Sequence, residues 1–279
     1  MKILDGKKVR DIISEKIKDE LNKINAKPKL VIIQVGDDER STIYVRQKKI
    51  FGEKLGFEVE HINLDKDIKE EDLISKIEVL NSEETVNGII VQLPLPKIFD
   101  VYKIVDSIKP EKDVDGLNSV NTAKLFRNES LSFIPATTKG VLSLLDFYNI
   151  DVSGKKVAVV GRSLLVGRPT VFSMLNRNAT ITICHSKTSN LKEEIKNSDI
   201  VIVAVGKPNL ITEDFVKEGQ VIIDVGITKV GDKLLGDVDF ESISKKVEAI
   251  TPVPGGVGPM TVVSLFENLL LAYKKQHNL

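Results

Sequence analysis

The chain has 279 residues, of which 42% are hydrophobic, so it is long enough for two domains of ordinary size and apolar enough to build their cores. Forty Lys and Arg residues balance forty Asp and Glu residues, which gives no basis for expecting a nucleic-acid or membrane partner. Cys184 is the only cysteine, which excludes an intramolecular disulfide and fits a reducing compartment. The charged N-terminus has no apolar segment of signal-peptide length, so we expect a cytoplasmic protein.

The first half of the chain alternates apolar runs of strand length with segments of helical period. We expect strands at Leu30–Gly36, 57–64 and 88–94. Helical spacing at Glu39–Leu55 and Asp72–Leu80 fills the intervals between them. This order predicts a parallel sheet with helices on its faces.

The second half repeats this alternation after a helix predicted at Thr138–Asn149. Its strands are expected at KKVAVVG (155–161), ATITIC (179–184), DIVIVAVG (199–206), QVIIDVG (220–226) and VEAIT (247–251). A last helix is predicted at Val262–Lys275. The sequence therefore predicts an α/β protein of two domains with parallel sheets, the second a Rossmann-type dinucleotide-binding domain.

We place the domain boundary just before the helix that joins the halves. The first domain is expected at residues 1–137 and the second at 138–260. We expect the C-terminal helical segment, 261–279, to pack back onto the first domain. The Pro- and Gly-rich stretch TPVPGGVGPM (251–260) precedes it and is not expected to be regular structure. On composition alone this stretch is either a rigid connection or a backbone wall beside a cofactor.

Glycines at the start of the second half predict a dinucleotide-binding turn. VAVVGRSLLVGRPT (157–170) is a buried strand followed by a glycine turn and a helix start. Such a turn lets backbone amides approach a pyrophosphate, whose negative charge is favoured by the helix N-terminus. Gly161 ends the strand and Gly167 lies near the helix start, while Ser163 stands where the middle glycine is usual. Gly161, Arg162 and Ser163 are therefore our candidate cofactor contacts.

The end of the next strand, CHSKT (184–188), indicates which dinucleotide binds. An NAD site usually has Asp or Glu there, about 20 residues beyond the turn, to bind the adenosine ribose. This segment has no carboxylate and carries hydroxyl groups, a histidine and a lysine. A hydroxyl such as that of Ser186 and the guanidinium of Arg162 suit a 2′-phosphate, so we expect NADP. We set aside thiol catalysis by Cys184 and His185, because adjacent strand residues point to opposite faces.

Three stretches of the first half carry groups suited to proton transfer or substrate binding. Tyr44 and Lys48 are four residues apart, so on a helix they share one face. Gln92 lies at the carboxyl end of a predicted parallel strand, where ligands bind in such sheets. The acidic turn KDVDG contributes Asp115. Each pattern alone is more readily structural than functional, since most lysines on helices face water and Asp and Gly favour turns.

The spacing of Tyr44 and Lys48 is also that of short-chain dehydrogenases. In those enzymes the nucleotide turn comes near the N-terminus and the tyrosine follows it. Here Tyr44 precedes Gly161, so the order is reversed and we set that family aside.

Seven motifs follow one another in a characteristic order: SxxYVxxK (41–48), VQLPLP (91–96), KDVDG (112–116), GRSxxVGxP (161–169), CHSKT (184–188), GDVDF (236–240) and PVPGGVGPMT (252–261). In this set the chain resembles the bifunctional methylenetetrahydrofolate dehydrogenase/methenyltetrahydrofolate cyclohydrolase family. The resemblance covers nearly the whole chain, and VQLPLP and the last motif are its most specific parts.

The resemblance implies oxidation of 5,10-methylenetetrahydrofolate by NADP and hydrolysis of the methenyl product to 10-formyltetrahydrofolate. It implies that Lys48 moves protons in the hydrolysis, with a pKa lowered by a partly apolar pocket. Gln92 would orient Lys48, Tyr44 would border the folate ring, and Asp115 would accept hydrogen bonds from the pterin. Ile227 matches a family position that contacts the nicotinamide side of the cofactor through its backbone.

One departure from the family lies at the predicted domain junction. The family commonly has Pro-Cys-Thr-Pro-x-Gly there, whereas this chain has Pro135-Ala136-Thr137-Thr138-Lys139-Gly140. We expect Ala136 and Thr138 to affect the rigidity of the junction, because neither replaces a proposed proton-transfer group.

Two other functions stay open on the sequence. One is a dehydrogenase that lacks the hydrolysis step, and the other is an NADP-sensing binding module on the same fold. Tyr44, Lys48 and Gln92 argue against the first, and the same three residues with Asp115 argue against the second. We expect a folate substrate, no metal, no nucleic-acid or membrane partner, and a homodimer formed through an exposed strand edge of the second domain.

Overall fold

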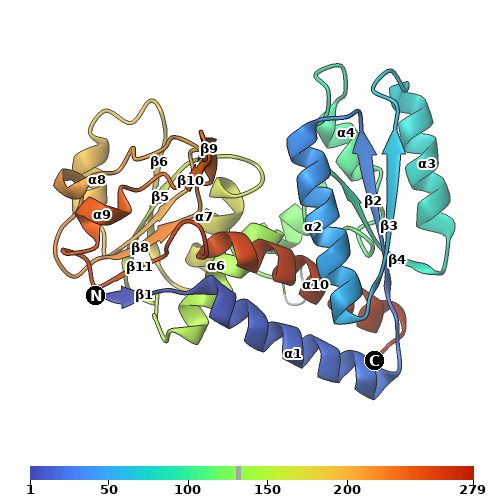
Figure 1. The fold of residues 1–279 in the computed structure, drawn as a ribbon, viewed down its shortest axis with the longest axis horizontal. Helices are drawn as coiled ribbons and strands as arrows, with labels where there is room; N and C mark the ends of the chain where they lie inside the picture. Colours follow the sequence, from blue (N-terminus) through green and yellow to red (C-terminus); the bar gives the residue numbers. More distant parts are fainter. Residues whose placement is uncertain (130–132) are drawn as a thin grey trace. The chain divides into compact units, whose positions relative to one another are not determined.

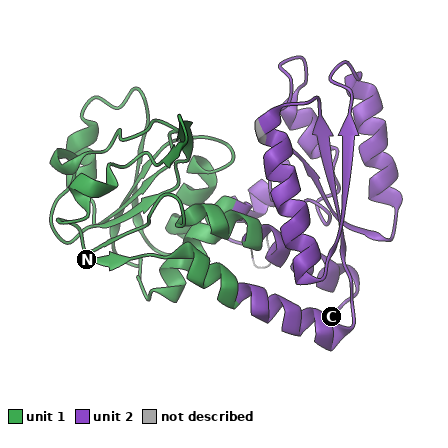
Figure 2. Cartoon of the chain, in the orientation of Figure 1, with its two compact units in different colours: residues 1–12, 137–263 green, residues 13–136, 264–279 purple. Residues whose placement is uncertain are grey.

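Two parallel sheets, one in each of two units, organise the chain (Figures 1 and 2). The computed structural model describes residues 1–129 and 133–279. Unit 1 comprises residues 1–12 and 137–263, and unit 2 comprises residues 13–136 and 264–279. The predicted α/β class with two parallel-sheet domains is confirmed.

Unit 2 contains a three-stranded parallel sheet in the order β3-β2-β4. Its central strand, β2 (Lys29–Val35), pairs with β3 (Glu58–Leu64) and β4 (Val86–Val91). The helices of this unit are α2 (Glu39–Leu55), α3 (Glu70–Ser82), α4 (Val101–Asp106) and α5 (Ser119–Phe126), with the larger parts of α1 (Gly6–Ile24) and α10 (Val257–Gln276). All five elements predicted for this half are present; α2 has its predicted ends, and the ends of the other four are shifted by a few residues.

Local signals fix both ends of α2, the helix that carries Tyr44 and Lys48. The Asp38 carboxylate accepts a hydrogen bond from the Ser41 amide at 2.8 Å and so caps the N-terminus. Gly56, with φ of 106°, ends the helix in the left-handed conformation that glycine adopts without strain. These caps explain why the helix runs from Glu39 to Leu55 as the sequence predicts.

The C-terminal helix packs into unit 2 through an aromatic contact. The rings of Phe266 and Phe57 lie 5.1 Å apart, and both side chains are buried. A Cβ on Gly52 of α2 would lie 2.3 Å from the Phe266 ring, so glycine is needed there. The chain from Ser264 onward accordingly belongs to unit 2.

Unit 1 contains a six-stranded sheet in the order β1-β11-β8-β7-β5-β6, with every neighbouring pair parallel. The strands are β1 (Lys2–Ile3), β5 (Lys156–Val160), β6 (Thr180–Cys184), β7 (Ile200–Val203), β8 (Val221–Asp224) and β11 (Ala249–Ile250). An antiparallel pair, β9 (Thr228–Val230) and β10 (Lys233–Leu235), follows β8. The helices are α6 (Ala136–Phe147), α7 (Gly167–Asn176), α8 (Leu191–Lys196), η1 (Glu213–Phe215) and α9 (Phe240–Ile243).

The N-terminal residues differ from the prediction, which grouped residues 1–137 in one domain. β1 pairs with β11, so residues 1–12 belong to unit 1. The Gly6 amide donates to the Gly255 carbonyl at 2.9 Å, and a Cβ on Gly6 would lie 1.8 Å from the Gly256 carbonyl oxygen. A two-residue strand has no periodicity to detect, and its partner lies at the other end of the sequence.

The last helix begins at Val257, earlier than the predicted start at Val262. Pro259 therefore lies in the first helical turn, where its missing amide breaks no helical hydrogen bond. Before the helix, the Gly256 amide donates to the Pro252 carbonyl at 2.8 Å and closes a turn. The Gly- and Pro-rich stretch is thus a turn followed by a helix start.

At the junction, Thr138 lies in the first turn of α6, and its side chain is fully buried. Its hydroxyl forms a hydrogen bond with the hydroxyl of Thr170 on α7 at 3.1 Å. The departure at position 138 therefore adds a polar link between α6 and α7 within unit 1.

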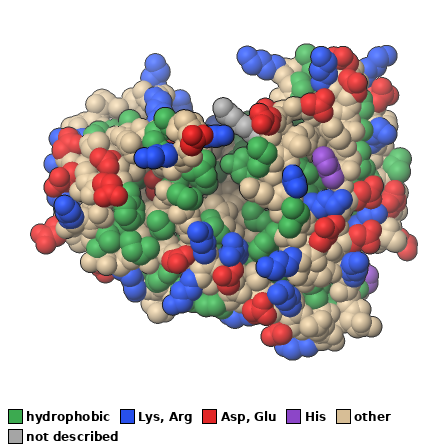
Figure 3. Space-filling model, viewed as in Figure 1, with side chains coloured by type: hydrophobic (Ala, Val, Ile, Leu, Met, Phe, Trp, Pro, Cys, Tyr) green, Lys and Arg blue, Asp and Glu red, His purple; other side chains and the backbone are tan. Residues whose placement is uncertain are grey.

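Charges of both signs are interspersed over the face shown in Figure 3, in keeping with the balanced composition. In the described parts of the chain, 1–129 and 133–279, no helix combines the length and the apolar character that crossing a membrane requires.

Candidate active site

Lys48 and Gln92 meet at the carboxyl edge of the unit 2 sheet. The side-chain nitrogen of Lys48, on α2, donates a hydrogen bond to Oε1 of Gln92 at 3.0 Å. The Gln92 side-chain NH₂ donates to the Leu93 carbonyl at 2.7 Å, so the amide oxygen is turned toward Lys48. The backbone amide of Gln92 donates to the Ile33 carbonyl at 2.8 Å, which ties this residue to the end of the sheet.

Asp115 is the charged neighbour of this pair. Burial lowers the pKa of Lys48, and the negative charge of Asp115 opposes that shift. Burial likewise raises the pKa of Asp115, and the positive charge of Lys48 opposes it. Both side chains are half-buried rather than sealed off, so a ligand can reach them. A lysine with a lowered pKa is suited to accept and release protons near neutral pH.

Tyr44 lies one turn before Lys48 on α2. Its side chain is 46% exposed, so part of the ring is open to a ligand. The structure thus brings Lys48, Gln92 and Asp115 together and places Tyr44 on the adjacent turn of the same helix.

The segment that carries Asp115 is held by its buried neighbour Asp113. The Asp113 carboxylate accepts hydrogen bonds from the amides of Leu117 at 3.3 Å and Asn118 at 2.9 Å, and from the Asn121 side chain at 2.8 Å. Burial raises the pKa of Asp113 to about 6. Asp113 therefore holds the loop from inside the protein, whereas Asp115 is partly exposed to solvent.

Two further contacts fix the backbone around Asp115. Gly116 has φ of 72°, and a Cβ there would lie 2.5 Å from the Phe133 carbonyl oxygen. The side chain of Asn268 on α10 donates to the carbonyls of Val114 and Ile134, each at 2.9 Å. The sequence did not lead us to a role for Asp113 or Asn268. Asp113 could have been considered as the first Asp of KDVDG, whereas nothing in the sequence around Asn268, inside a long helix, indicates its contacts.

Close approach of the backbone requires glycine at the turn after β5. Gly161 has φ of 129°, and a Cβ there would lie 2.3 Å from the Ala204 carbonyl oxygen. A Cβ on Gly167 would lie 2.3 Å from the Gly161 carbonyl oxygen. The Ser163 hydroxyl accepts hydrogen bonds from the amides of Val166 at 3.2 Å and Gly167 at 3.3 Å, at the start of α7. These amides lie at the N-terminus of α7, where an anion would bind.

The register of β5 and β6 brings two other predicted cofactor residues to one edge. Val160 pairs with Cys184, and Arg162 and Ser186 each lie two residues beyond that pair. Both side chains are exposed. With no carboxylate at the end of β6, a guanidinium and a hydroxyl fit a phosphate group better than a ribose diol.

Loop 184–188 is organised by its own side chains. The His185 amide donates to the Thr188 hydroxyl at 2.9 Å, and the Lys187 amide donates to Nδ1 of His185 at 3.1 Å. Cys184 is buried, and burial raises the pKa of its thiol to about 11. A thiol of that pKa stays protonated at neutral pH, so it does not serve as a nucleophile.

Ile227 follows β8 and lies on the carboxyl side of the unit 1 sheet. Its side chain is partly exposed. A Cβ on Gly258 would lie 3.0 Å from the Cδ1 atom of Ile227, so the two residues are close neighbours. The predicted cofactor residues thus follow β5, β6 and β8, whose carboxyl ends share one edge of the sheet.

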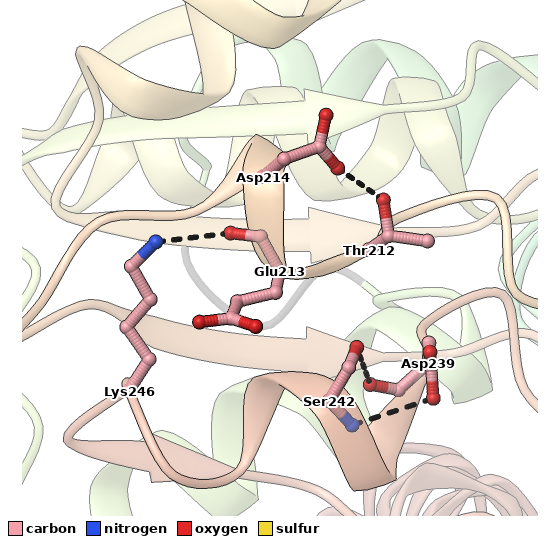
Figure 4. Close-up of a pocket in the computed structure, with 6 residues that line it drawn as sticks. All are labelled: Thr212, Glu213, Asp214, Asp239, Ser242 and Lys246. Atoms are coloured by element: carbon pink, nitrogen blue, oxygen red, sulfur yellow. Dashed lines mark hydrogen bonds between the residues drawn. The ribbon is translucent and has the colours of Figure 1, made fainter.

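A cavity of about 390 Å³ elsewhere in unit 1 does not coincide with these residues. It is lined by Thr212, Glu213, Asp214, Asp239, Ser242 and Lys246 (Figure 4). Its polar groups bond mainly to one another, as in the Lys246 ammonium donating to the Glu213 carbonyl at 3.1 Å. In the described parts of the chain, no group of three or more His, Cys, Asp or Glu side chains is arranged to hold a metal ion.

The fold and the site define a two-domain α/β protein with a dinucleotide turn in one unit and a lysine–amide–carboxylate set in the other. Residues 135–277 match the family model described as tetrahydrofolate dehydrogenase/cyclohydrolase, NAD(P)-binding domain. Residues 4–115 match the corresponding catalytic domain. The chain belongs to the tetrahydrofolate dehydrogenase/cyclohydrolase family, which confirms the resemblance carried by its motifs.

Curated relatives match the chain from end to end. A protein from Hydrogenobaculum sp. (strain Y04AAS1), named bifunctional protein FolD, is 49% identical over 277 residues, covering 99% of this chain and 100% of the relative. A protein of the same name from Aquifex aeolicus is 48% identical and covers 98% of this chain and 96% of the relative.

Solved structures also match nearly the whole chain. The bifunctional methylenetetrahydrofolate dehydrogenase/cyclohydrolase from Campylobacter jejuni superposes with a TM-score of 0.96 at 41% identity, covering 99% of both chains. The Trypanosoma brucei dehydrogenase-cyclohydrolase, solved with NADP and an inhibitor, has a TM-score of 0.94 at 35% identity and covers 99% of this chain and 98% of that one.

Proposed function

We propose that this protein oxidises 5,10-methylenetetrahydrofolate with NADP⁺ and hydrolyses the resulting 5,10-methenyltetrahydrofolate to 10-formyltetrahydrofolate. The observation that carries the proposal is the hydrogen bond between Lys48 and Gln92 beside Asp115. A dehydrogenase needs no such proton-transfer set, because hydride transfer requires chiefly the orientation of two rings. A hydrolytic step does need one.

The residues at the carboxyl edge of unit 1 fit the cofactor. NADP⁺, when bound, supplies the hydride acceptor. Arg162 and Ser186 would hold the adenosine 2′-phosphate, and the amides at the start of α7, next to Ser163, would meet the pyrophosphate. Gly161 leaves the space for this approach, and the backbone of Ile227 would lie at the nicotinamide side.

In the hydrolysis, water adds to the methenyl carbon of the cationic substrate. Neutral Lys48 accepts a proton from the attacking water, which leaves a hydroxyl group on this carbon. The bond from this carbon to N5 then breaks as Lys48 returns that proton to N5, and the hydroxyl proton passes to solvent as the formyl C=O forms. Gln92 keeps the Lys48 amine directed at the reacting atoms. Asp115 accepts hydrogen bonds from the pterin N–H groups, and the open face of Tyr44 packs on the folate ring.

Replacing Lys48 by Met tests this assignment, with Lys49→Met as the matched control. Lys49 is the next residue of the same helix and lies 4.0 Å from the Glu53 carboxylate. We expect wild type and Lys49→Met to reduce NADP⁺ with methylenetetrahydrofolate and to remove methenyltetrahydrofolate faster than buffer does. Lys48→Met should lose about 10²–10⁴-fold in hydrolysis, the usual contribution of a general acid–base.

Each outcome separates one reading from another. Wild type that oxidises the folate but hydrolyses it no faster than buffer would be a plain dehydrogenase. Wild type that binds NADP⁺ without either reaction would be a binding module. Equal losses in the Lys48→Met and Lys49→Met proteins would remove Lys48 from the mechanism.

We also infer that the protein is a cytoplasmic homodimer. β6 lies at the edge of the unit 1 sheet, and the side chain of Ile183 on this strand is 41% exposed. An edge strand of this kind supports pairing with a second copy. Sedimentation equilibrium would give twice the monomer mass if the inference holds and the monomer mass if it fails. The single buried Cys184 is consistent with a reducing cytoplasm.

A further inference from the structure

Two buried carboxylates in unit 1 have no part in the chemistry proposed above. Asp237, with no exposed surface, belongs to the GDVDF motif. Its Oδ2 accepts hydrogen bonds from the amides of Val205 at 2.6 Å and Gly206 at 3.0 Å, and its Oδ1 accepts one from Lys207 at 2.6 Å. One side chain therefore fixes three successive residues of the loop that follows β7.

Asp224, the last residue of β8, is 3% exposed and holds the next loop. Its Oδ1 accepts hydrogen bonds from the amides of Gly226 at 2.9 Å and Asp237 at 3.1 Å. Its Oδ2 accepts one from the Val238 amide at 2.9 Å. Asp224 thus fixes the residue just before Ile227 and also the backbone of the segment that carries Asp237.

Two glycines allow these carboxylates to approach the backbone. A Cβ on Gly226 would lie 2.2 Å from the carboxyl carbon of Asp237. A Cβ on Gly236 would lie 1.9 Å from Oδ2 of Asp224. Both loops are therefore shaped around the two acids.

Burial raises the pKa of Asp224 to about 7, and the charge of Asp237 adds to the shift, while the amide hydrogen bonds oppose it. Buried acids whose charged form is disfavoured are more frequent at functional sites than elsewhere in a fold. Asp224 also lines a cavity of about 330 Å³, together with Gly236 and Thr251.

We propose that Asp224 and Asp237 are positioning residues for the nicotinamide half of NADP⁺. Asp237 sets the loop after β7, and Asp224, through the Gly226 amide, fixes the backbone after β8 that leads into Ile227. The inference rests on the proposed function for the identity of the cofactor. It concerns only this half of the site, because Arg162 and Ser186 lie beyond β5 and β6.

The test compares two ligands on the free protein by calorimetry. NADP⁺ spans both halves of the site, whereas adenosine 2′,5′-bisphosphate reaches only the 2′-phosphate half. The variants are Asp224→Asn and Asp237→Asn, in which an NH₂ donor replaces one acceptor oxygen and faces an amide N–H. Asp239→Asn is the matched control, because the Asp239 carboxylate accepts the Ser242 amide at 3.4 Å as a helix cap of α9.

For both test variants we expect NADP⁺ to bind about tenfold more weakly, equivalent to about 1.4 kcal/mol. Binding of adenosine 2′,5′-bisphosphate and hydrolysis of methenyltetrahydrofolate should stay within about twofold of wild type, a change of less than about 0.5 kcal/mol. Asp239→Asn should behave as wild type with both ligands.

Three results would overturn the proposal. The first is NADP⁺ affinity in both test variants equal to that of Asp239→Asn. The second is a parallel loss of both ligands, or failure of the variants to fold, which would make the carboxylates structural only. The third is failure of wild type to bind NADP⁺. Wild type that binds NADP⁺ but lacks folate turnover would refute the proposed function while the ligand comparison still decides this inference.

Discussion

Gln92→Glu would test whether the protonation of Lys48 controls hydrolysis. The substitution keeps the shape of the side chain and adds a negative charge 3.0 Å from the Lys48 nitrogen. Its second oxygen would replace the NH₂ group that donates to the Leu93 carbonyl at 2.7 Å, so two acceptors would face each other. That repulsion directs the new charge toward Lys48.

The magnitude follows from the effect of an opposite charge on a half-buried amine. A carboxylate at this distance raises the pKa of a lysine by about 1–3 units. Burial lowers the pKa of Lys48 in the wild type, and the new charge would cancel that effect. The neutral fraction of Lys48 near pH 7, and the hydrolysis rate with it, would fall by about 10–1000-fold, since each pKa unit is a factor of ten.

The assay is the pH dependence of methenyltetrahydrofolate hydrolysis above the spontaneous rate, from about pH 6 to about pH 9. We expect the rising limb of the profile for Gln92→Glu to move to higher pH, so that activity recovers in alkaline buffer. Gln92→Met removes the acceptor without adding charge and should lower the rate with no upward movement. A Gln92→Glu profile that coincides with the wild-type profile would refute our account of Lys48.

Three further predictions concern unit 1. Arg162→Ala should raise KM for NADP⁺ about tenfold and leave KM for NAD⁺ unchanged in steady-state assays, because the guanidinium would meet only the 2′-phosphate; equal effects on both would remove Arg162 from that role. Thr138→Val should lower the free energy of unfolding in urea by about 1–3 kcal/mol, because it leaves the buried Thr170 hydroxyl without its partner, and Thr170→Val in the same chain should recover most of the loss. Finally, the pKa of Asp224 is about 7 in the folded state, above the ordinary 3.8, so folding retains a proton that the unfolded chain releases. This contribution to stability is present below about pH 4 and is lost as the pH rises through about 7; urea unfolding across that range should show the decline in wild type and a flatter profile in Asp224→Asn.

The regular elements were predictable where the signal is local. The buried strands are short runs of β-branched residues, as in Lys156–Val160, and no other structure suits them at that length. The helix Glu39–Leu55 was predicted with its observed ends, because its capping residues are adjacent in sequence. The last helix was predicted to begin too late, because its first turn contains Gly258 and Pro259 and looks like a loop on composition.

What the sequence did not reveal depends on partners far along the chain. β1 is defined only by its pairing with Ala249–Ile250. Asn268 matters because it reaches the Val114 carbonyl, and nothing near it in sequence indicates that contact. The contact between Lys48 and Gln92, which lie 44 residues apart, could be expected only from the family motifs that contain them.

The tripeptide Asp-Val-Asp shows this limit within one chain. It occurs at 113–115 and again at 237–239, and in both places the first Asp and the Val are buried while the second Asp is only half-buried. Both copies also form a parallel bridge to a strand or loop, Ile89 with Asp113 and Ile211 with Val238. In each copy the first carboxylate binds backbone amides and so fixes a loop.

The second Asp of each copy has a different role. Asp115 is the charged neighbour of Lys48, whereas Asp239 caps α9 through the Ser242 amide. A loop that must stay open to ligands cannot be held by an apolar core on all sides. A buried carboxylate that accepts hydrogen bonds from several amides can hold such a loop from its inner side alone. The tripeptide therefore does not by itself show what its second Asp does, because that depends on the element that faces it.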